Sequence, residues 1–225
     1  ADKLGYLTWG ESASWGANTS SPEAARNFLT EWEEVVVRDR NHPSIIVWTP
    51  FNETWDRPND NEQARQHDRF ISDVYKLSQN DASGNYHVMT DIWSVHHYAQ
   101  SGEEMKKRLE IKDGKLPQKD VKKEVPYEGQ PYFVDEYGGI KWVHGKQFAE
   151  NTWGYGQGPK TLDEFYARLK DITFTVLEFD FVAGYCYTQL TDVEQEQNGI
   201  YNYDRTPKFD MEIIKSIFNK LPEKK

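Results

Sequence analysis

Short apolar runs that end in polar residues alternate along this chain with segments whose apolar residues recur at helical spacing. The run at residues 45–48 is bounded by turn residues, which is typical of a strand buried on both faces of a parallel sheet. The same reasoning predicts strands at residues 6–10, 88–95, 132–134 and 183–190. Alternation of this kind favours a parallel α/β architecture.

The first two helices are predicted between these strands. Ser21-Pro22 supplies an N-cap and a first-position proline, and Asn41-His42-Pro43 ends that helix. The second helix runs over residues 61–77. The helical spacing turns the following residues inward: Ala25, Phe28, Leu29, Trp32, Val35 and Val36 in the first helix, and Ala64, Ile71, Val74 and Tyr75 in the second.

Two more helices are predicted in the second half of the chain. Thr161 and Glu164 form a capping box for a helix that extends to about residue 179, and Asp210 caps a terminal helix. The charged segment 112–130, which contains several Gly and Pro residues, is predicted to be a loop.

Two of the predicted strands end in carboxylates. The first is followed by Asn52-Glu53, and the second by Asp135-Glu136 and a Gly-Gly turn. Acidic residues at the carboxyl ends of barrel strands are where (β/α) barrels build active sites. A single strand-end Glu is usually a solvated residue, but two behind buried strands indicate the two-carboxylate chemistry of glycoside hydrolysis.

The residues around these carboxylates resemble the barrel domain of glycoside hydrolase family 2, which holds β-galactosidases, β-glucuronidases and β-mannosidases. Residues 1–11 resemble the third barrel strand of that family. Residues 41–53 resemble the fourth strand with its acid/base Glu, and residues 133–139 resemble the seventh strand with its nucleophile. Residues 184–208 resemble the eighth strand and the segment after it.

This resemblance implies a TIM (β/α)8 barrel, but one that is incomplete. Family strands 1, 2 and 5 are not found, and about eight residues of the family pattern are missing at the Gln79–Asn80 junction. We therefore expect residues 1–225 to be a partial catalytic domain of a larger multidomain glycosidase, preceded by β-sandwich domains. Because an open barrel exposes strand edges, we expect the isolated chain to be poorly stable or inactive.

The resemblance assigns roles to individual residues. Glu53 is the acid/base and Glu136 the nucleophile of a retaining mechanism, in which the two carboxyl groups lie about 5–5.5 Å apart. Asn52 is expected to donate to the sugar 2-hydroxyl, and His96 and Tyr98 are expected near the sugar.

Other candidate residues follow from position alone. Asp135 competes with Glu136, but adjacent strand residues point to opposite faces and the family motif selects Glu136. Tyr137 is a candidate for a hydrogen bond to the nucleophile, with core packing equally plausible. Glu11 is a candidate to line the pocket, with a rim salt bridge as the alternative. The candidate sugar platforms are Trp55, Trp93 and Trp142, for each of which core packing is the stronger reading.

The composition of the chain limits the kinds of partner and ligand that it is expected to bind. The formal net charge of −10, without a basic run, disfavours nucleic acids and anionic membranes as partners. Eight Trp and thirteen Tyr suit stacking on sugar faces as well as core packing. His96-His97 diverge on a strand without further ligands at metal spacing, so neither a metal nor a cofactor is expected. Cys186 lies within a predicted strand and is expected to be a small core residue.

The sequence predicts a retaining exo-β-glycosidase that hydrolyses terminal non-reducing β-linked sugars. Family glucuronidases carry Asn-x-Lys before the Gly that follows strand eight, whereas this chain has Glu196-Gln197-Asn198 before Gly199. This difference favours a neutral sugar, and β-galactosides in particular. A related barrel endoglycosidase and a non-catalytic carbohydrate-binding fragment remain as alternatives. A bacterial origin is favoured, while homo-oligomerisation and the compartment (cytoplasm, periplasm or secretion) are left open.

Overall fold

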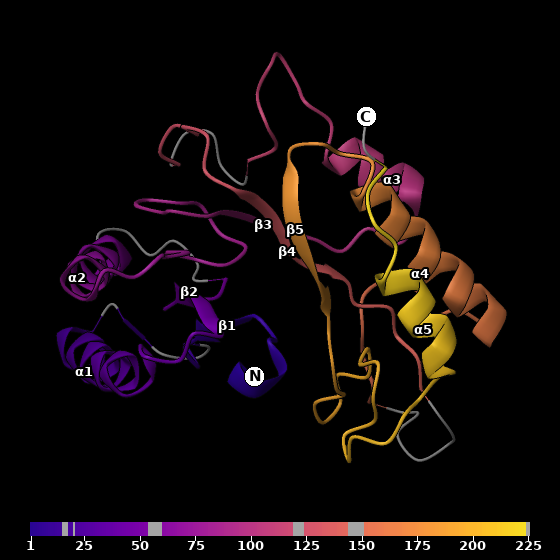
Figure 1. Cartoon of the computed structure of the whole chain (residues 1–225), viewed down its shortest axis with the longest axis horizontal. Helices are drawn as coiled ribbons and strands as arrows, with labels where there is room; N and C mark the ends of the chain where they lie inside the picture. The colour runs from indigo at the N-terminus through magenta and orange to yellow at the C-terminus, as the bar shows by residue number, and fades with distance from the viewer. Residues whose placement is uncertain (15–17, 20, 54–59, 119–123, 144–150, 224–225) are drawn as a thin grey trace. The chain divides into compact units, whose positions relative to one another are not determined.

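The computed structural model describes residues 1–14, 18–19, 21–53, 60–118, 124–143 and 151–223, and within α2 the side chains from residue 68 onward. These residues form two compact units (Figure 1). The first comprises Ala1–Val95 and Gln118–Phe133, and the second comprises His96–Pro117 and Val134–Lys225.

The first unit contains two strands and two α-helices that pack on each other. β1 (Thr8–Glu11) and β2 (Ile45–Thr49) are parallel, with Glu11 opposite Thr49 at their carboxyl ends. α1 (Pro22–Asp39) and α2 (Asp60–Tyr75) contact each other (Figure 1). A short 3-10 helix, η1 (Asp2–Leu4), precedes β1. The buried apolar side chains of this core include Leu29, Trp32, Val36, Trp48, Phe51 and Ile71.

Residues 78–83 run alongside β2 without forming a regular strand. Parallel bridges join Trp48 to Gln79 and Asn52 to Ser83. The backbone N–H of Asn80 donates to the carbonyl of Trp48 at 3.0 Å, and that of Ser83 donates to Phe51 at 2.9 Å. The sequence pattern showed no strand here. The chain nevertheless pairs with this edge of β2 through an irregular extended segment, and no regular fifth strand was expected from the sequence.

The second unit contains a layer of α-helices and the strands around residue 136. α4 (Leu162–Val176) contacts both α3 (Gly102–Arg108) and α5 (Met211–Phe218), as Figure 1 shows. β3 (Trp93–His97), β4 (Tyr132–Gly138) and β5 (Val182–Thr188) form a sheet of that order. The chain passes from the first unit to the second within β3 and again within β4.

The predicted N-cap residues are confirmed, but Ser21 makes no side-chain cap bond and the predicted capping box does not close. Ser21 is the N-cap of α1 without a side-chain hydrogen bond, while Asp210 accepts from Glu212 N–H at 3.0 Å. Thr161 accepts from Glu164 N–H at 3.1 Å, but the Glu164 carboxylate accepts from Lys160 rather than closing the box on Thr161.

Several local predictions were wrong. α3 was missed, although Ser101 accepts from Glu104 N–H in the Ser-x-x-Glu pattern of a helix start. Val74 is 52% exposed and Ile46 is 42% exposed, so neither is a core residue. Cys186 is also exposed, because Tyr185 and Tyr187 occupy the β5 positions that face Tyr137.

The strand starting at Val88 was predicted too early. β3 begins only at Trp93, because the Asp81 carboxylate accepts from the backbone N–H groups of Val88 (2.7 Å) and Met89 (3.2 Å) and holds them in a turn. Over the described residues the strands form sheets of two and three members, which is an incomplete barrel. No helix in that part of the chain is both long enough and apolar enough to cross a membrane.

Candidate active site

Glu53 lies just beyond β2, in a backbone conformation that few non-glycine residues adopt. Its φ is 42°, in the left-handed region. Its N–H donates to the carbonyl of Ser83 at 2.8 Å, and the N–H of Asn52 donates to Ser14 Oγ at 2.9 Å. Both side chains are partly buried. Strained backbone of this kind persists where surrounding contacts fix it, and it is common at functional sites.

A buried polar cluster anchors the segment that holds Glu53. His87 and Asp81 are almost fully buried and lie 2.7 Å apart through Nδ1 and Oδ1. The Nε2 atom of His87 lies 3.1 Å from both the N and the O of Ser94. Burial lowers the pKa of His87, but the Asp81 carboxylate outweighs burial and the net pKa is raised. The cluster therefore fixes the backbone two residues before Ser83.

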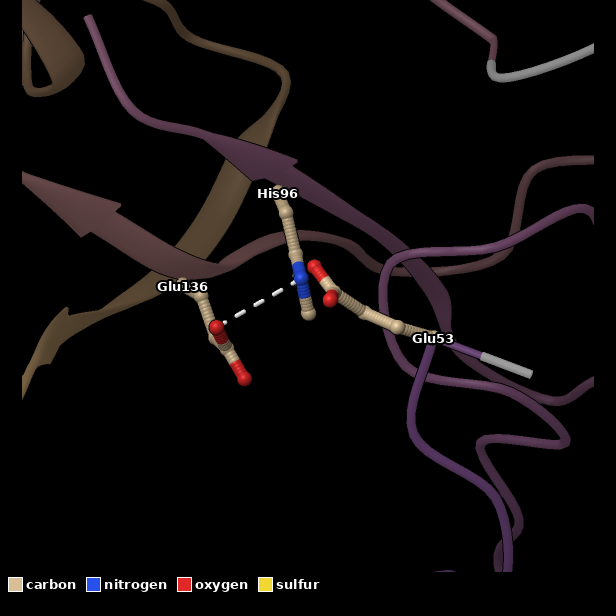
Figure 2. A group of neighbouring side chains, drawn as sticks. All are labelled: Glu53, His96 and Glu136. Atoms are coloured by element: carbon tan, nitrogen blue, oxygen red, sulfur yellow. Dashed lines mark ion pairs between the residues drawn. The ribbon is translucent and has the colours of Figure 1, made fainter. Parts of the chain in front are cut away.

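Glu136 lies on β4 with its carboxylate beside two polar groups of the second unit. Figure 2 shows His96 on β3 and Glu136 on β4, with the dashed line between them. His96 Nδ1 is 3.5 Å from Glu136 Oε2, and the Tyr98 hydroxyl donates a hydrogen bond to the same oxygen. The Glu136 side chain is 24% exposed. The Glu136 carboxylate thus has two polar neighbours and remains partly exposed.

Asp135 is placed differently from its neighbour. Its side chain is 5% exposed, and Oδ1 lies 3.6 Å from Nε2 of His96. The imidazole of His96 therefore has one ring nitrogen near each of the two carboxylates. Because a nucleophile must reach the substrate, the greater exposure of Glu136 favours it over Asp135.

Tyr98 is partly buried and packs face to face on Tyr155. The ring centroids are 3.4 Å apart and the planes differ by 2°. Burial, followed by the negative charge of Glu136, raises the pKa of Tyr98 well above its ordinary value of 10.0. The hydroxyl consequently keeps its proton and acts as a donor to the Glu136 carboxylate.

The Gly138-Gly139 turn after β4 needs glycine at both positions. Their φ values are 81° and 55°, and a Cβ on Gly138 would come 2.5 Å from Cε2 of Tyr187. A Cβ on Gly139 would overlap the ring of Tyr155. Gln100 ties this turn to the end of β3, since its Nε2 donates to the carbonyls of Gly138 (2.8 Å) and Tyr98 (3.3 Å).

Tyr137 and Trp93 are placed in the core. Tyr137 is fully buried, and its hydroxyl pairs with Thr173 Oγ1 at 2.8 Å, on the opposite face of β4 from Glu136. Trp93 is also fully buried and packs against His87 and Tyr127. Both placements support the packing role that the sequence left open.

The remaining candidates are spread over the two units. Glu11 is exposed at the end of β1. Trp142 is partly buried and packs against Phe165 and Phe209. Trp55 lies outside the described residues. Sequence reasoning missed Tyr155, because nothing in the local pattern indicates that it lies against Tyr98.

The polar and charged side chains of the segment after β5 bind one another. Asn198 is fully buried, donates to Glu196 Oε1 at 3.0 Å and accepts from Gln189 Nε2 at 2.8 Å. The ammonium of Lys208 lies 2.8 and 3.0 Å from the two oxygens of Asp192. Burial lowers the pKa of Lys208 despite this partner.

Comparison with known proteins identifies relatives over nearly the whole chain. The family model "Glycosyl hydrolases family 2, TIM barrel domain" matches residues 3–222. Two curated β-galactosidases from Vibrio vulnificus, of strains YJ016 and CMCP6, are 30% and 29% identical over 121 residues. Each alignment covers 53% of this chain and 11% of the relative, so the chain matches only a small part of those proteins.

Solved structures share the fold at low sequence identity. A family 2 β-galacturonidase from Eisenbergiella tayi has a TM-score of 0.68 at 14% identity, covering 97% of this chain and 42% of that one. A β-glucuronidase from Faecalibacterium prausnitzii has a TM-score of 0.61 at 15% identity, covering 89% and 36%. These similarities establish the architecture of the chain and leave its substrate open.

Proposed function

This chain belongs to glycosyl hydrolase family 2, and we propose that it is the catalytic barrel domain of a retaining exo-β-glycosidase. The observation that carries the proposal is the setting of Glu136. Its carboxylate accepts a hydrogen bond from Tyr98, lies beside His96 and stays partly open to solvent. A nucleophilic carboxylate needs this combination of a fixed orientation and an accessible face.

In the proposed reaction Glu136 attacks the anomeric carbon and the bond to the departing oxygen breaks. Glu53 gives that oxygen a proton, which leaves a glycosyl ester on Glu136. Glu53 then takes a proton from water, the water oxygen attacks the anomeric carbon, and Glu136 is released. The Tyr98 hydroxyl orients Glu136 for attack and stabilises the negative charge that returns to its carboxylate as the ester breaks.

The backbone around Glu53 supports its role as acid/base. The left-handed φ and the hydrogen bond to Ser83 fix the direction in which its side chain leaves the chain. Asn52, immediately before it, is proposed to contact the sugar 2-hydroxyl, an interaction that strengthens in the transition state.

We propose a β-galactoside as substrate. The chain has Glu196-Gln197-Asn198 where family glucuronidases carry an amide and a cation, and the nearby Lys208 ammonium is bound by both oxygens of Asp192. A lysine ammonium that is bound in this way is poorly placed to bind the carboxylate of a uronic acid. The curated relatives named β-galactosidase agree with a neutral sugar, whereas the solved neighbours act on uronic acids by name.

The decisive experiment is covalent trapping with a 2-deoxy-2-fluoro-β-galactosyl fluoride. The full protein that contains this chain should acquire one label, and peptide mapping should find it on Glu136. A label on any other residue would overturn the nucleophile assignment. Sugar binding without labelling or hydrolysis would indicate a carbohydrate-binding fragment, and cleavage within oligosaccharides would indicate an endoglycosidase. Faster hydrolysis of an aryl β-glucuronide than of the aryl β-galactoside would overturn the choice of sugar.

A further inference from the structure

We infer that Tyr155 is a positioning residue for the nucleophile and acts through Tyr98. The inference rests on the proposed function, because it concerns the hydrogen bond that Tyr98 donates to Glu136. Tyr155 lies in the segment between β4 and α4 and does not belong to the residues that the sequence pointed to. All the contacts involved lie within the second unit.

The ring of Tyr155 restricts how Tyr98 can move. The two rings are stacked in parallel at 3.4 Å, so Tyr98 cannot rotate about its side-chain bonds without displacing Tyr155. The ring contact of Tyr98 with His96 is edge-on, with the ring centroids 6.2 Å apart, and does not stack on the face of Tyr98. Gln100 fixes the backbone carbonyl of Tyr98 but not its ring. The stacking contact therefore sets the direction of the hydroxyl.

Tyr155 is itself held by the turn that follows the nucleophile. Its N–H donates to the carbonyl of Gly139 at 2.9 Å, and a parallel bridge joins it to Ile140. The same segment is fixed two residues earlier, where Trp153 N–H donates to Gln195 at 2.8 Å and its carbonyl accepts from Gln197 at 2.9 Å. Gly139 is also the residue whose missing Cβ makes room for the Tyr155 ring. Direct contacts therefore connect Tyr155 to the Gly138-Gly139 turn that follows Glu136.

This arrangement has a specific consequence for catalysis. A hydrogen bond weakens steeply as its angle departs from linearity, so a freely turning Tyr98 would orient Glu136 less well and would stabilise less the charge that returns to it as the ester breaks. Because burial and Glu136 raise the pKa of Tyr98, its hydroxyl remains a donor whenever the ring is held in place. Removing Tyr155 should therefore impair the chemical step rather than substrate binding.

The test is a double-mutant cycle of Tyr155 and Tyr98 on an aryl β-galactoside. Tyr155→Leu should lower kcat about 10-fold, as loss of one hydrogen bond to a charged group does, and leave KM within about twofold. In the Tyr98→Phe background, where no hydroxyl remains to be positioned, the same substitution should lower kcat less than about twofold. Tyr155→Phe keeps the ring and should restore kcat to within about threefold of the unsubstituted chain.

Tyr166→Leu serves as the matched control, because it removes a tyrosine ring of the same unit that packs on Phe209 and not on Tyr98. Its kcat should stay unchanged. Equal losses from Tyr155→Leu in both backgrounds, or a Tyr155→Phe variant as impaired as Tyr155→Leu, would overturn the inference. If the full protein that contains the unsubstituted chain hydrolyses no glycoside, the proposed function fails instead. In that case the thermal midpoints of the five variants and of the unsubstituted protein show whether each was folded.

Discussion

The carbonyl of Ser83 accepts a hydrogen bond from the backbone N–H of Glu53 at 2.8 Å. Ser83 belongs to the irregular segment that lies along β2, and Asp81 of the same segment is buried with His87. The proposed acid/base thus takes its backbone position from a part of the chain that has no regular secondary structure. The position of Glu53 therefore depends on the buried His87–Asp81 pair as well as on β2.

Replacing the proposed nucleophile should abolish turnover and leave the fold intact. Glu136→Ala is expected to lower kcat on the order of 10³-fold or more, since the covalent intermediate can no longer form. Azide should restore turnover and give the α-glycosyl azide, because it attacks from the space left by the carboxylate. Formation of the β-azide, identified by NMR, would contradict the assignment.

The proposed acid/base should show its role through the leaving group. Glu53→Ala should slow a disaccharide by about 10²–10⁴-fold and a dinitrophenyl glycoside far less, because a weakly basic leaving oxygen needs no proton. Azide should here give the β-azide, since it attacks the glycosyl ester on Glu136. Equal rate losses for both substrates, measured as kcat/KM, would exclude Glu53 as the acid.

Gly139 should tolerate no side chain, for two separable reasons. Gly139→Ala must adopt a positive φ and also push against Tyr155, so it should destabilise the chain by about 2–3 kcal/mol and lower kcat. Gly114→Ala has a similar positive φ of 73° with open space around it, and should cost only about 1 kcal/mol. Equal midpoints of urea unfolding for the two variants would show that the Tyr155 contact is unimportant.

Breaking the buried His87–Asp81 pair should lower the free energy of unfolding far more than breaking an ion pair at the surface. Asp81→Asn should destabilise the chain by about 3 kcal/mol or more, whereas Asp39→Asn, which removes the partner of the exposed Arg38, should have a much smaller effect. Urea unfolding of the two variants measures both effects. Equal losses would mean that the cluster does not anchor the segment that holds Glu53.

The same pair predicts a pH dependence. The folded-state pKa of His87 is raised above its ordinary value of 6.5, so the stabilisation is fully present below that pH and is lost as the pH rises through the folded-state pKa. The stability difference between the unsubstituted chain and Asp81→Asn should therefore be larger near neutral pH than in alkaline solution. A difference that grows with pH would contradict this.

Buried tyrosines should control unfolding at high pH. Burial raises the pKa values of Tyr98, Tyr137 and Tyr187 above 10.0, so their contribution is fully present below pH 10 and is lost as the pH rises further. Each should remove about 1.4 kcal/mol of stability per pH unit above that point. The tyrosinate absorbance should accordingly show a late cooperative step that coincides with loss of helix signal, rather than one gradual titration.

The sequence by itself determined the features that depend on neighbouring residues. Apolar runs followed by carboxylates pointed to Glu53, just after β2, and Glu136, on β4, because the burial pattern along a strand is a local property. Thr161 and Asp210 were recognisable as caps for the same reason, since each bonds an N–H only a few residues away. Even the missed helix α3 carried its capping pattern at Ser101.

Only the tertiary structure decided which distant residues meet. Nothing in the pattern around Tyr155 indicates its stacking on Tyr98, and nothing around His87 indicates a buried contact with Asp81. The pairing of residues 78–83 with β2 was equally hidden, because it uses backbone groups that every sequence possesses. Periodicity records which face of an element is buried, whereas the path of the chain determines what covers that face.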